Sequence, residues 1–525
     1  MLRVIVTFHS PREAVGGNQA PAARLANCCQ VCANRVLVVV SVTLPSANSA
    51  EHLGSGLRHS HVWFGVALAA AAYYPRFIKL PAGMETYPQA ASCLWHGQML
   101  QACDQGFTYP PFFAMVMLPF AIMPLWLRDL VWYGVTLAAT IGAFRFSETL
   151  ARKALPSPLD GAELFWLRIL ALLLSAKVIL AVFENQAYDA LVLVAVLSGL
   201  AALRDGRAVA AGAALALAAA LKATPLIFLP YLLWKRYFAS AIAFVLVYAA
   251  ASLLPDMLFA PAAGPGYFTS WLREVAGPSL GVNPAGAPFA FWDGANILNH
   301  SLRGAVSLNI DEAQHRGLFE AALASVDGCF AVIVGTLLAV SPRRPQSIAI
   351  DGSLLLIAML MLSPMTSRSH YVALLLPYMT LLACNFRDRS SARLGRAVLA
   401  TSFGLVTLAG NDAVGQTVTV WAYRHSAIVL GTLVLLFYFA VLVIEQLSEE
   451  APVARPENFP LPLWEGVASA ARERCTSRVR DTLRVARVPS PASLDARHSR
   501  CIGSASLNKD RARRTPMTLS RKERG

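Results

Sequence analysis

Long apolar runs separated by short polar or basic connections dominate the chain between residues 62 and 446. A bilayer core is crossed by about 20 apolar helical residues, and a soluble protein rarely needs repeated runs of that length. The pattern therefore predicts an all-α polytopic membrane protein with about twelve transmembrane helices. We expect these at Val62–Leu80, Leu130–Phe146, Leu164–Phe183, Ala187–Leu203, Ala208–Leu221, Thr224–Trp234, Tyr237–Leu254, Leu318–Val340, Ile348–Leu362, Tyr371–Asn385, Ala397–Gly410 and Ile428–Ile444.

Two apolar stretches do not fit a simple crossing. Pro110–Leu127 is interrupted by four prolines, which lack the backbone N–H and fix φ, so we interpret it as an interfacial or re-entrant piece. Ala208–Trp234 contains two runs that are each shorter than the hydrocarbon thickness, with Lys222 at the break between them. That stretch forms either one broken helix or a shallow hairpin. Lys222 is either a functional group at membrane depth or a lysine that extends to the interface.

Basic residues cluster in alternate connections, which sets the predicted orientation. Because cytoplasmic loops carry an excess of Lys and Arg, both termini are expected in the cytoplasm of a bacterial cell and the protein in its inner membrane. Residues 1–61 are then a disordered cytoplasmic leader, 62–446 the membrane domain, and 447–525 a basic, disordered cytoplasmic tail. Long extracytoplasmic loops follow the first and seventh spans. Basic residues that fall on the cytoplasmic side are Arg145, Arg152, Lys153, Arg204, Arg207, Lys235, Arg236, Arg343, Arg344, Arg387, Arg389, Arg393 and Arg396.

Composition narrows the possible functions. Only 14% of the residues are charged and 56% are hydrophobic, and the net charge of +14 comes from short loops and the tail, so no nucleic-acid surface is expected. The chain has no Walker A loop, no GxGxxG after a strand, no HExxH and no DxD, and we predict neither a cofactor nor a metal. Among nine cysteines, Cys93 and Cys103 share an expected external loop, where they form either a disulfide or two free thiols.

The stretch Gly83–Phe113 is the strongest candidate for chemistry. It is a polar and aromatic interruption directly after the first expected span, and it carries two carboxylates, Glu85 and Asp104, in a chain where acids are scarce. A carboxylate at such a position acts as a base or is simply a solvated loop residue. The same external side receives Glu184-Asn185-Gln186 and the Ser363–His370 turn. Polar side chains therefore gather on one face of the predicted membrane domain.

Three stretches, in this order and spacing, resemble glycosyltransferase family 87 of the GT-C superfamily. The first has Tyr87, then the alanines 90 and 91 and FTYPPFF at 107–113. The second has Glu184-Asn185-Gln186, Gly206-Arg207 and ALKATPLIFLPY at 220–231. The third has LSPMTSRSHY at 362–371 followed by LLLP. The family usually places an aspartate shortly before the tyrosine, where this chain has Glu85, and it has GQ where this chain has Asn185-Gln186.

The resemblance implies a GT-C-like fold and transfer of a hexose, mannose by preference, from a polyprenyl-phosphate sugar to an extracytoplasmic lipid or glycan acceptor, with inversion. Such a reaction needs a base and cations that hold the leaving phosphate. We expect Glu85 or Asp104 as the base, and Lys222, Arg368 and His370 at the donor phosphate. Tyr87, Tyr109, Asn185 and Gln186 are expected to bind substrate. For Tyr87 and Tyr109 the alternative is an interfacial anchor, and for His370 a helix cap.

Two other functions remain open from the sequence. A multi-pass transporter or lipid flippase would also have many spans and a few charges at membrane depth, although its substrate groups usually lie near the midplane between repeats. A scaffold subunit of an envelope-polysaccharide assembly with a degenerate site is the third alternative. No internal repeat is evident in the chain, and the polar residues gather on one face, so we favour the enzyme.

Overall fold

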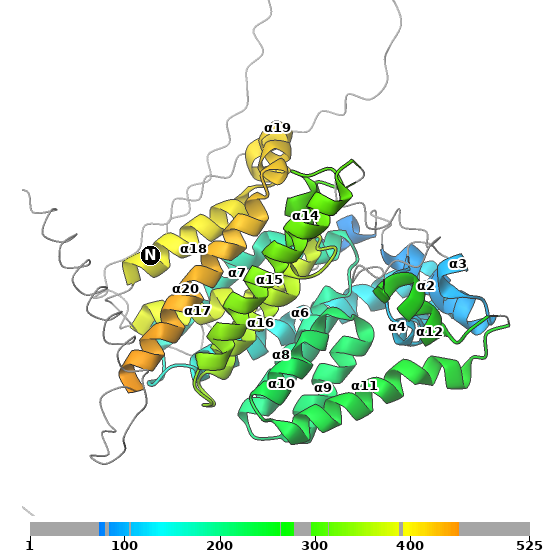
Figure 1. Ribbon diagram of the computed structural model, residues 1–525, viewed down its shortest axis with the longest axis horizontal. Coiled ribbons are helices and arrows are strands. Elements are labelled where there is room, and N and C mark those ends of the chain that lie inside the picture. Colours follow the sequence, from blue (N-terminus) through cyan, green and yellow to red (C-terminus); the bar gives the residue numbers. More distant parts are fainter. Residues whose placement is uncertain are drawn as a thin grey trace, which may run out of the picture. The chain divides into compact units, whose positions relative to one another are not determined.

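The computed structural model describes residues 73–78, 83–103, 107–262, 264–277, 296–312, 314–387 and 392–450. All regular elements in these ranges are helical, as the sequence predicts, and none is a strand (Figure 1). The expected leader, most of the first expected span, Asp104 and residues 451–525 lie outside the described residues. Helix α20 continues to Glu450, past residue 447 where we expected the tail to begin. The helices are α2 (Gly83–Trp95), α3 (Leu100–Cys103), α4 (Pro111–Val116), α5 (Leu118–Ile122), α6 (Leu125–Lys153), α7 (Gly161–Glu184), α8 (Asp189–Arg204), α9 (Ala208–Leu221), η2 (Thr224–Ile227), α10 (Phe228–Trp234), α11 (Phe238–Leu258), α12 (Tyr267–Trp271), η3 (Leu272–Ala276), α14 (Leu302–Ser307), α15 (Arg316–Val340), α16 (Ile348–Met361), η5 (Arg368–Leu374), α17 (Leu375–Arg387), α18 (Ala392–Phe403), η6 (Gly404–Leu408), α19 (Asn411–Arg424) and α20 (Ala427–Glu450).

Six helical segments in the described ranges are long and apolar enough to cross a membrane, and a seventh arises if the bent pair 393–408 and Asn411–Arg424 is one span. Three shorter apolar helices, Ala208–Leu221, Thr224–Trp234 and Ile348–Met361, lie at positions that we counted among the twelve expected spans, the first two of which we already expected to be too short for a simple crossing. The fold is thus that of a polytopic helical membrane protein, while the total of twelve spans stays a prediction. The six are α6, α7, α11, α15, the continuous segment Arg368–Arg387 and the first part of α20.

Both stretches that the sequence marks as irregular are broken helices. Between Pro110 and Leu127 the chain forms α4, α5 and the start of α6, with breaks at Met117 and at Met123-Pro124. Helix α9 ends at Leu221 because Lys222 adopts an extended conformation, and Pro225 then lies in the first turn of η2. The break at Lys222 therefore lies where the sequence predicts it.

The core around the site is built by close helix packing. Helix α8 lies between α6 and α9, and α11 packs along the other side of α9 (Figure 1). Gly212 of α9 faces the backbone of Ser240 in α11 so closely that a Cβ at this position would collide with the Ser240 carbonyl oxygen. Small residues on α9 thus allow the backbones of α9 and α11 to approach closely.

The expected loop after the first span is largely helical. It forms α2 and α3, and a disulfide joins Cys93 of α2 to Cys103 of α3. Of the two alternatives left open by the sequence, the structure has the disulfide. The loop after the seventh expected span contains α12, η3 and α14 in its described parts.

Candidate functional site

The corner between α7 and α8 is the central element of the site. Gln186 lies at a left-handed φ of 48°, its N–H donates to the Phe183 carbonyl at 3.1 Å, and the Ala187 N–H donates to the Val182 carbonyl at 2.9 Å. This pair of hydrogen bonds is the usual C-terminal stop of a helix, with Gln186 at the position that normally holds glycine. The stop turns the chain sharply, so that α8 begins only three residues later at Asp189.

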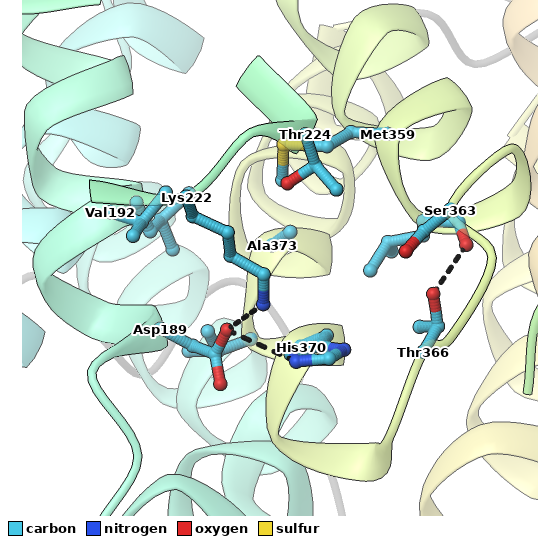
Figure 2. Close-up of a pocket in the computed structure, with 12 residues that line it drawn as sticks. Asp189, Val192, Lys222, Thr224, Met359, Ser363, Thr366, His370 and Ala373 are labelled. Atoms are coloured by element: carbon cyan, nitrogen blue, oxygen red, sulfur yellow. Dashed lines mark hydrogen bonds and ion pairs between the residues drawn. The ribbon is translucent and has the colours of Figure 1, made fainter. Parts of the chain in front are cut away.

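Asp189 is the centre of a charged cluster. Lys222 Nζ donates to Asp189 Oδ1 at 2.6 Å, His370 Nε2 lies 3.5 Å from the same oxygen, and Ser369 Oγ donates to Oδ2 at 2.9 Å. Figure 2 shows the Lys222 and His370 side chains pointing toward the Asp189 carboxylate from two different elements. Both carboxylate oxygens are therefore engaged, and the residue is 6% exposed.

A small cavity of about 20 Å³ adjoins this cluster. Charged, hydroxyl-bearing and apolar side chains line it together. Asp189, Lys222 and His370 contribute the charged groups, and Figure 2 shows Ser363 and Thr366 across the space from them. The other lining residues are Val192, Leu193, Thr224, Met359, Leu360, Val372 and Ala373.

His370 has a defined tautomer in this arrangement. The Ser367 N–H donates to His370 Nδ1 at 3.0 Å, so Nδ1 is the acceptor and the ring proton lies on Nε2, facing Asp189. The same bond is half of a capping box at the start of η5. His370 is thus a helix cap, one of the two alternatives from the sequence, and its Nε2 faces the Asp189 carboxylate. Its role at a donor phosphate stays a prediction.

Burial and the Asp189 carboxylate shift the pKa of Lys222 in opposite directions. Burial lowers the pKa of its ammonium group from the ordinary value of lysine, and the Asp189 carboxylate opposes this shift. The centre of the Tyr188 ring lies 5.6 Å from Lys222 Nζ. The ammonium therefore depends on Asp189 to stay charged in an otherwise buried position.

An aromatic cluster connects the first loop to this site. The rings of Tyr87 and Tyr109 lie 5.7 and 4.9 Å from the ring of Tyr188, and Phe113 stacks on Tyr188 at 4.2 Å. Tyr87 is buried at 4% exposure, and Tyr109 is half-buried. Tyr87 and Tyr109 therefore lie together, beside the residue that precedes Asp189.

Glu85 and Arg368, which the sequence also singled out, do not line the cavity. Glu85 is exposed on α2, and Asp104 lies outside the described residues. The Arg368 guanidinium donates to the Ala409 carbonyl at 3.2 Å and lies 5.5 Å from the Tyr423 ring. The structure thus brings Lys222 and His370 together, while Arg368 points to α19.

Asn185 and Gln186 do not line the cavity, whereas Asp189 lines it and was not predicted from the sequence. Asn185 caps α7, and the Gln186 side chain is buried in contacts with other protein groups. Asp189 was missed because it lies within Ala187–Leu203, which we took only as a span. An acid next to an apolar run was the signal that could have identified it.

Comparison with known proteins agrees with the resemblance found in the sequence. Residues 107–364 match the model of glycosyltransferase family 87. The family 87 match includes Tyr109, Asp189 and Lys222, and ends before His370. The expected resemblance to family 87 is therefore confirmed.

A curated relative points in the same direction. The chain is 29% identical over 291 residues to the polyprenol-phosphate-mannose-dependent alpha-(1-2)-phosphatidylinositol pentamannoside mannosyltransferase of Mycobacterium tuberculosis (strain CDC 1551 / Oshkosh). The aligned part covers 55% of this chain and 61% of that relative, so the two are comparable over about three fifths of the relative's length. No solved structure matches the chain significantly.

Proposed function

We propose that this protein is a membrane glycosyltransferase that moves a hexose, mannose by preference, from a polyprenyl-phosphate sugar to an extracytoplasmic lipid or glycan acceptor. The observation that carries the proposal is the convergence of Lys222 and His370 on Asp189, beside a small cavity that apolar side chains also line. A lipid-linked sugar phosphate likewise combines an anionic group with a hydrocarbon chain. The family match and the name of the curated relative support the same donor.

The proposed reaction is a single displacement. The acceptor hydroxyl oxygen forms a bond to the anomeric carbon, the bond from that carbon to the phosphate oxygen breaks, and the acceptor proton passes to a carboxylate. A single displacement inverts the anomeric centre. The leaving group is polyprenyl phosphate, and because the glycosyl-phosphate bond is already activated, no nucleotide is required.

Two side chains are suited to the leaving phosphate. The Lys222 ammonium supplies a compact positive charge, and His370 supplies an N–H donor from Nε2. Preformed donors of this kind stabilise the charge that develops on the leaving oxygen. Arg368, which we also expected at the phosphate, would have to leave Ala409 and Tyr423 to reach it, so we assign it to bracing α19 in the described conformation.

Glu85 is the proposed base, with Asp104 as the alternative. Both lie in the extracytoplasmic loop of the predicted topology, where a soluble or lipid-linked acceptor has access. The proposed setting is the inner membrane of a bacterial cell, with both termini in the cytoplasm. Tyr109 is half-buried and offers an aromatic ring beside the site, suited to stacking on a sugar, while the buried Tyr87 packs against it.

Transfer of radiolabelled mannose tests the proposal. Purified protein in lipid nanodiscs is incubated with polyprenyl-phosphate-[¹⁴C]mannose and a lipid extract as acceptor. We expect labelled glycolipid from the wild type and a loss of about 10²–10³-fold for Lys222→Ala, because one charged contact to the phosphate is removed. Lys153→Ala removes an exposed lysine at the end of α6 and serves as the matched control with unchanged transfer. Absence of transfer by the wild type, or equal rates for the two variants, would contradict the proposal.

A further inference from the structure

Gln186 adopts a backbone conformation that its side-chain type normally avoids. Its φ of 48° is left-handed, and the C-terminal stop in which it lies favours glycine because glycine has no Cβ. A residue other than glycine in such a position is strained and persists when other interactions fix it. The side chain of Gln186 must therefore contribute something that glycine cannot.

That contribution is a pair of side-chain hydrogen bonds, one to the end of the first expected span and one to the start of α2. Gln186 Oε1 accepts from the Met84 N–H at 3.3 Å, and Gln186 Nε2 donates to the Phe77 carbonyl at 3.2 Å. The backbone carbonyl of Gln186 accepts from Trp132 Nε1 at 2.8 Å. The residue is only 3% exposed, so these bonds form in a dry environment where an unmet polar group costs most.

The hydrogen bonds of Gln186 connect α2, which carries the proposed base Glu85, with the cluster around Asp189. Met84 is the residue immediately before Glu85 in the first turn of α2, and Asp189 follows Gln186 by only three residues. One short corner thus holds the start of α2 on one side and presents Asp189 to Lys222 on the other. The disulfide between Cys93 and Cys103 ties α3 to α2, so the segment that leads to Asp104 is attached to the same helix.

We propose that Gln186 is a positioning residue, which fixes the carboxylate-bearing helix α2 relative to the phosphate-binding cluster at Asp189, Lys222 and His370. This inference rests on the proposed function, because it concerns the distance between the base and the leaving group. It differs from the substrate-binding role that we expected for Gln186 from the sequence. The side chain acts through Met84 and Phe77, and it touches no substrate.

Two substitutions at Gln186 separate the side chain from the backbone. Gln186→Gly removes both side-chain hydrogen bonds while it relieves the left-handed strain. Gln186→Met keeps the length of the side chain and the strain but removes the same two bonds. Ser426→Gly is the matched control, because Ser426 is another residue other than glycine at positive φ, 53°, at the end of a helix that does not contact α2.

The measurement separates donor binding from transfer. Binding of polyprenyl phosphate is titrated for each variant in nanodiscs, and the rate of mannose transfer is expressed per bound donor site. We expect both Gln186 variants to bind the lipid within about threefold of wild type and to transfer mannose about 10²-fold more slowly, since a small misplacement of a reacting group has an effect of this size. Ser426→Gly should transfer at the wild-type rate.

Each result has a distinct meaning. Wild-type transfer per bound donor in Gln186→Gly would overturn the positioning role and leave the proposed function intact. A parallel loss of lipid binding and transfer would also overturn it, because a merely structural role predicts that pattern. A wild-type protein that binds polyprenyl phosphate but transfers no mannose would refute the proposed function itself.

Discussion

Lys222 Nζ lies 2.6 Å from Asp189 Oδ1, although Asp189 is the first residue of α8 and Lys222 follows the last residue of α9. The pair forms because α8 and α9 run side by side as a hairpin, so the start of one helix meets the end of the other. The carboxylate and the ammonium neutralise each other in a buried position, where either charge alone would be costly. Asp189 thus controls the charge state of the group proposed to bind the donor phosphate.

Asp189→Asn should make transfer depend on pH. Burial lowers the Lys222 pKa and Asp189 raises it, so the substitution lowers that pKa further. An ammonium with a lowered pKa is charged below that value and loses its proton as the pH rises through it. We expect the variant to lose activity at neutral pH and to recover part of it at acidic pH. The groups facing Lys222 are Asp189, His370 and the Tyr188 ring, and pH–rate profiles of wild type and variant measured from pH 5 to 9 check this. Profiles of the same shape would show that Asp189 does not set the charge of Lys222.

Glu85→Gln and Asp104→Asn should identify the base. Each amide keeps the size of the acid but accepts no proton, so the substitution at the true base should lower transfer by about 10²–10⁴-fold. The other substitution should have little effect. Rates are measured on protein of equal purity with confirmed insertion in the membrane. If neither variant loses activity, the loop does not provide the base.

Arg368→Ala should affect stability more than transfer. The guanidinium holds the Ala409 carbonyl and covers the Tyr423 ring, so its removal should loosen the connection between η5 and α19. We expect a lower midpoint of thermal unfolding and a loss of transfer smaller than that of Lys222→Ala. Thermal unfolding in detergent and mannose transfer are compared for both variants. A loss of transfer equal to that of Lys222→Ala, with normal unfolding, would instead place Arg368 at the phosphate, as the sequence suggested.

Reporter fusions should determine the orientation. Alkaline phosphatase is active only outside the cytoplasm, so a fusion after Gln101 or Ala285 should be active in the predicted topology. A fusion after Arg204 or Arg389 should be inactive, because these basic connections are predicted to be cytoplasmic. Activity is normalised to the amount of fusion protein. An active fusion after Arg204 would reverse the assignment of sides.

Local sequence signals predicted where the helices break, whereas the residues that meet at the site depend on tertiary contacts that the sequence does not show. The interruption at Lys222 was visible because Thr224-Pro225 cannot continue a helix, and the pairing of Cys93 with Cys103 was one of two alternatives. The role of Asp189 was not visible, because hydropathy does not tell which helix ends meet. The left-handed backbone of Gln186 was also hidden, since the sequence has glutamine where the conformation favours glycine. Helix lengths differed from the expected spans for a similar reason, because packing and proline positions set where a helix ends.

The bond between Cys93 and Cys103 has a consequence for the side of the membrane on which α2 and α3 lie. Thiols in the bacterial cytoplasm are kept reduced by dedicated reductants, whereas the periplasm oxidises exposed pairs. A disulfide in this loop is therefore chemically compatible with the extracytoplasmic side and incompatible with a lasting position in the cytoplasm. Redox chemistry thus favours the same orientation as the distribution of Arg and Lys, although the two arguments share no residue.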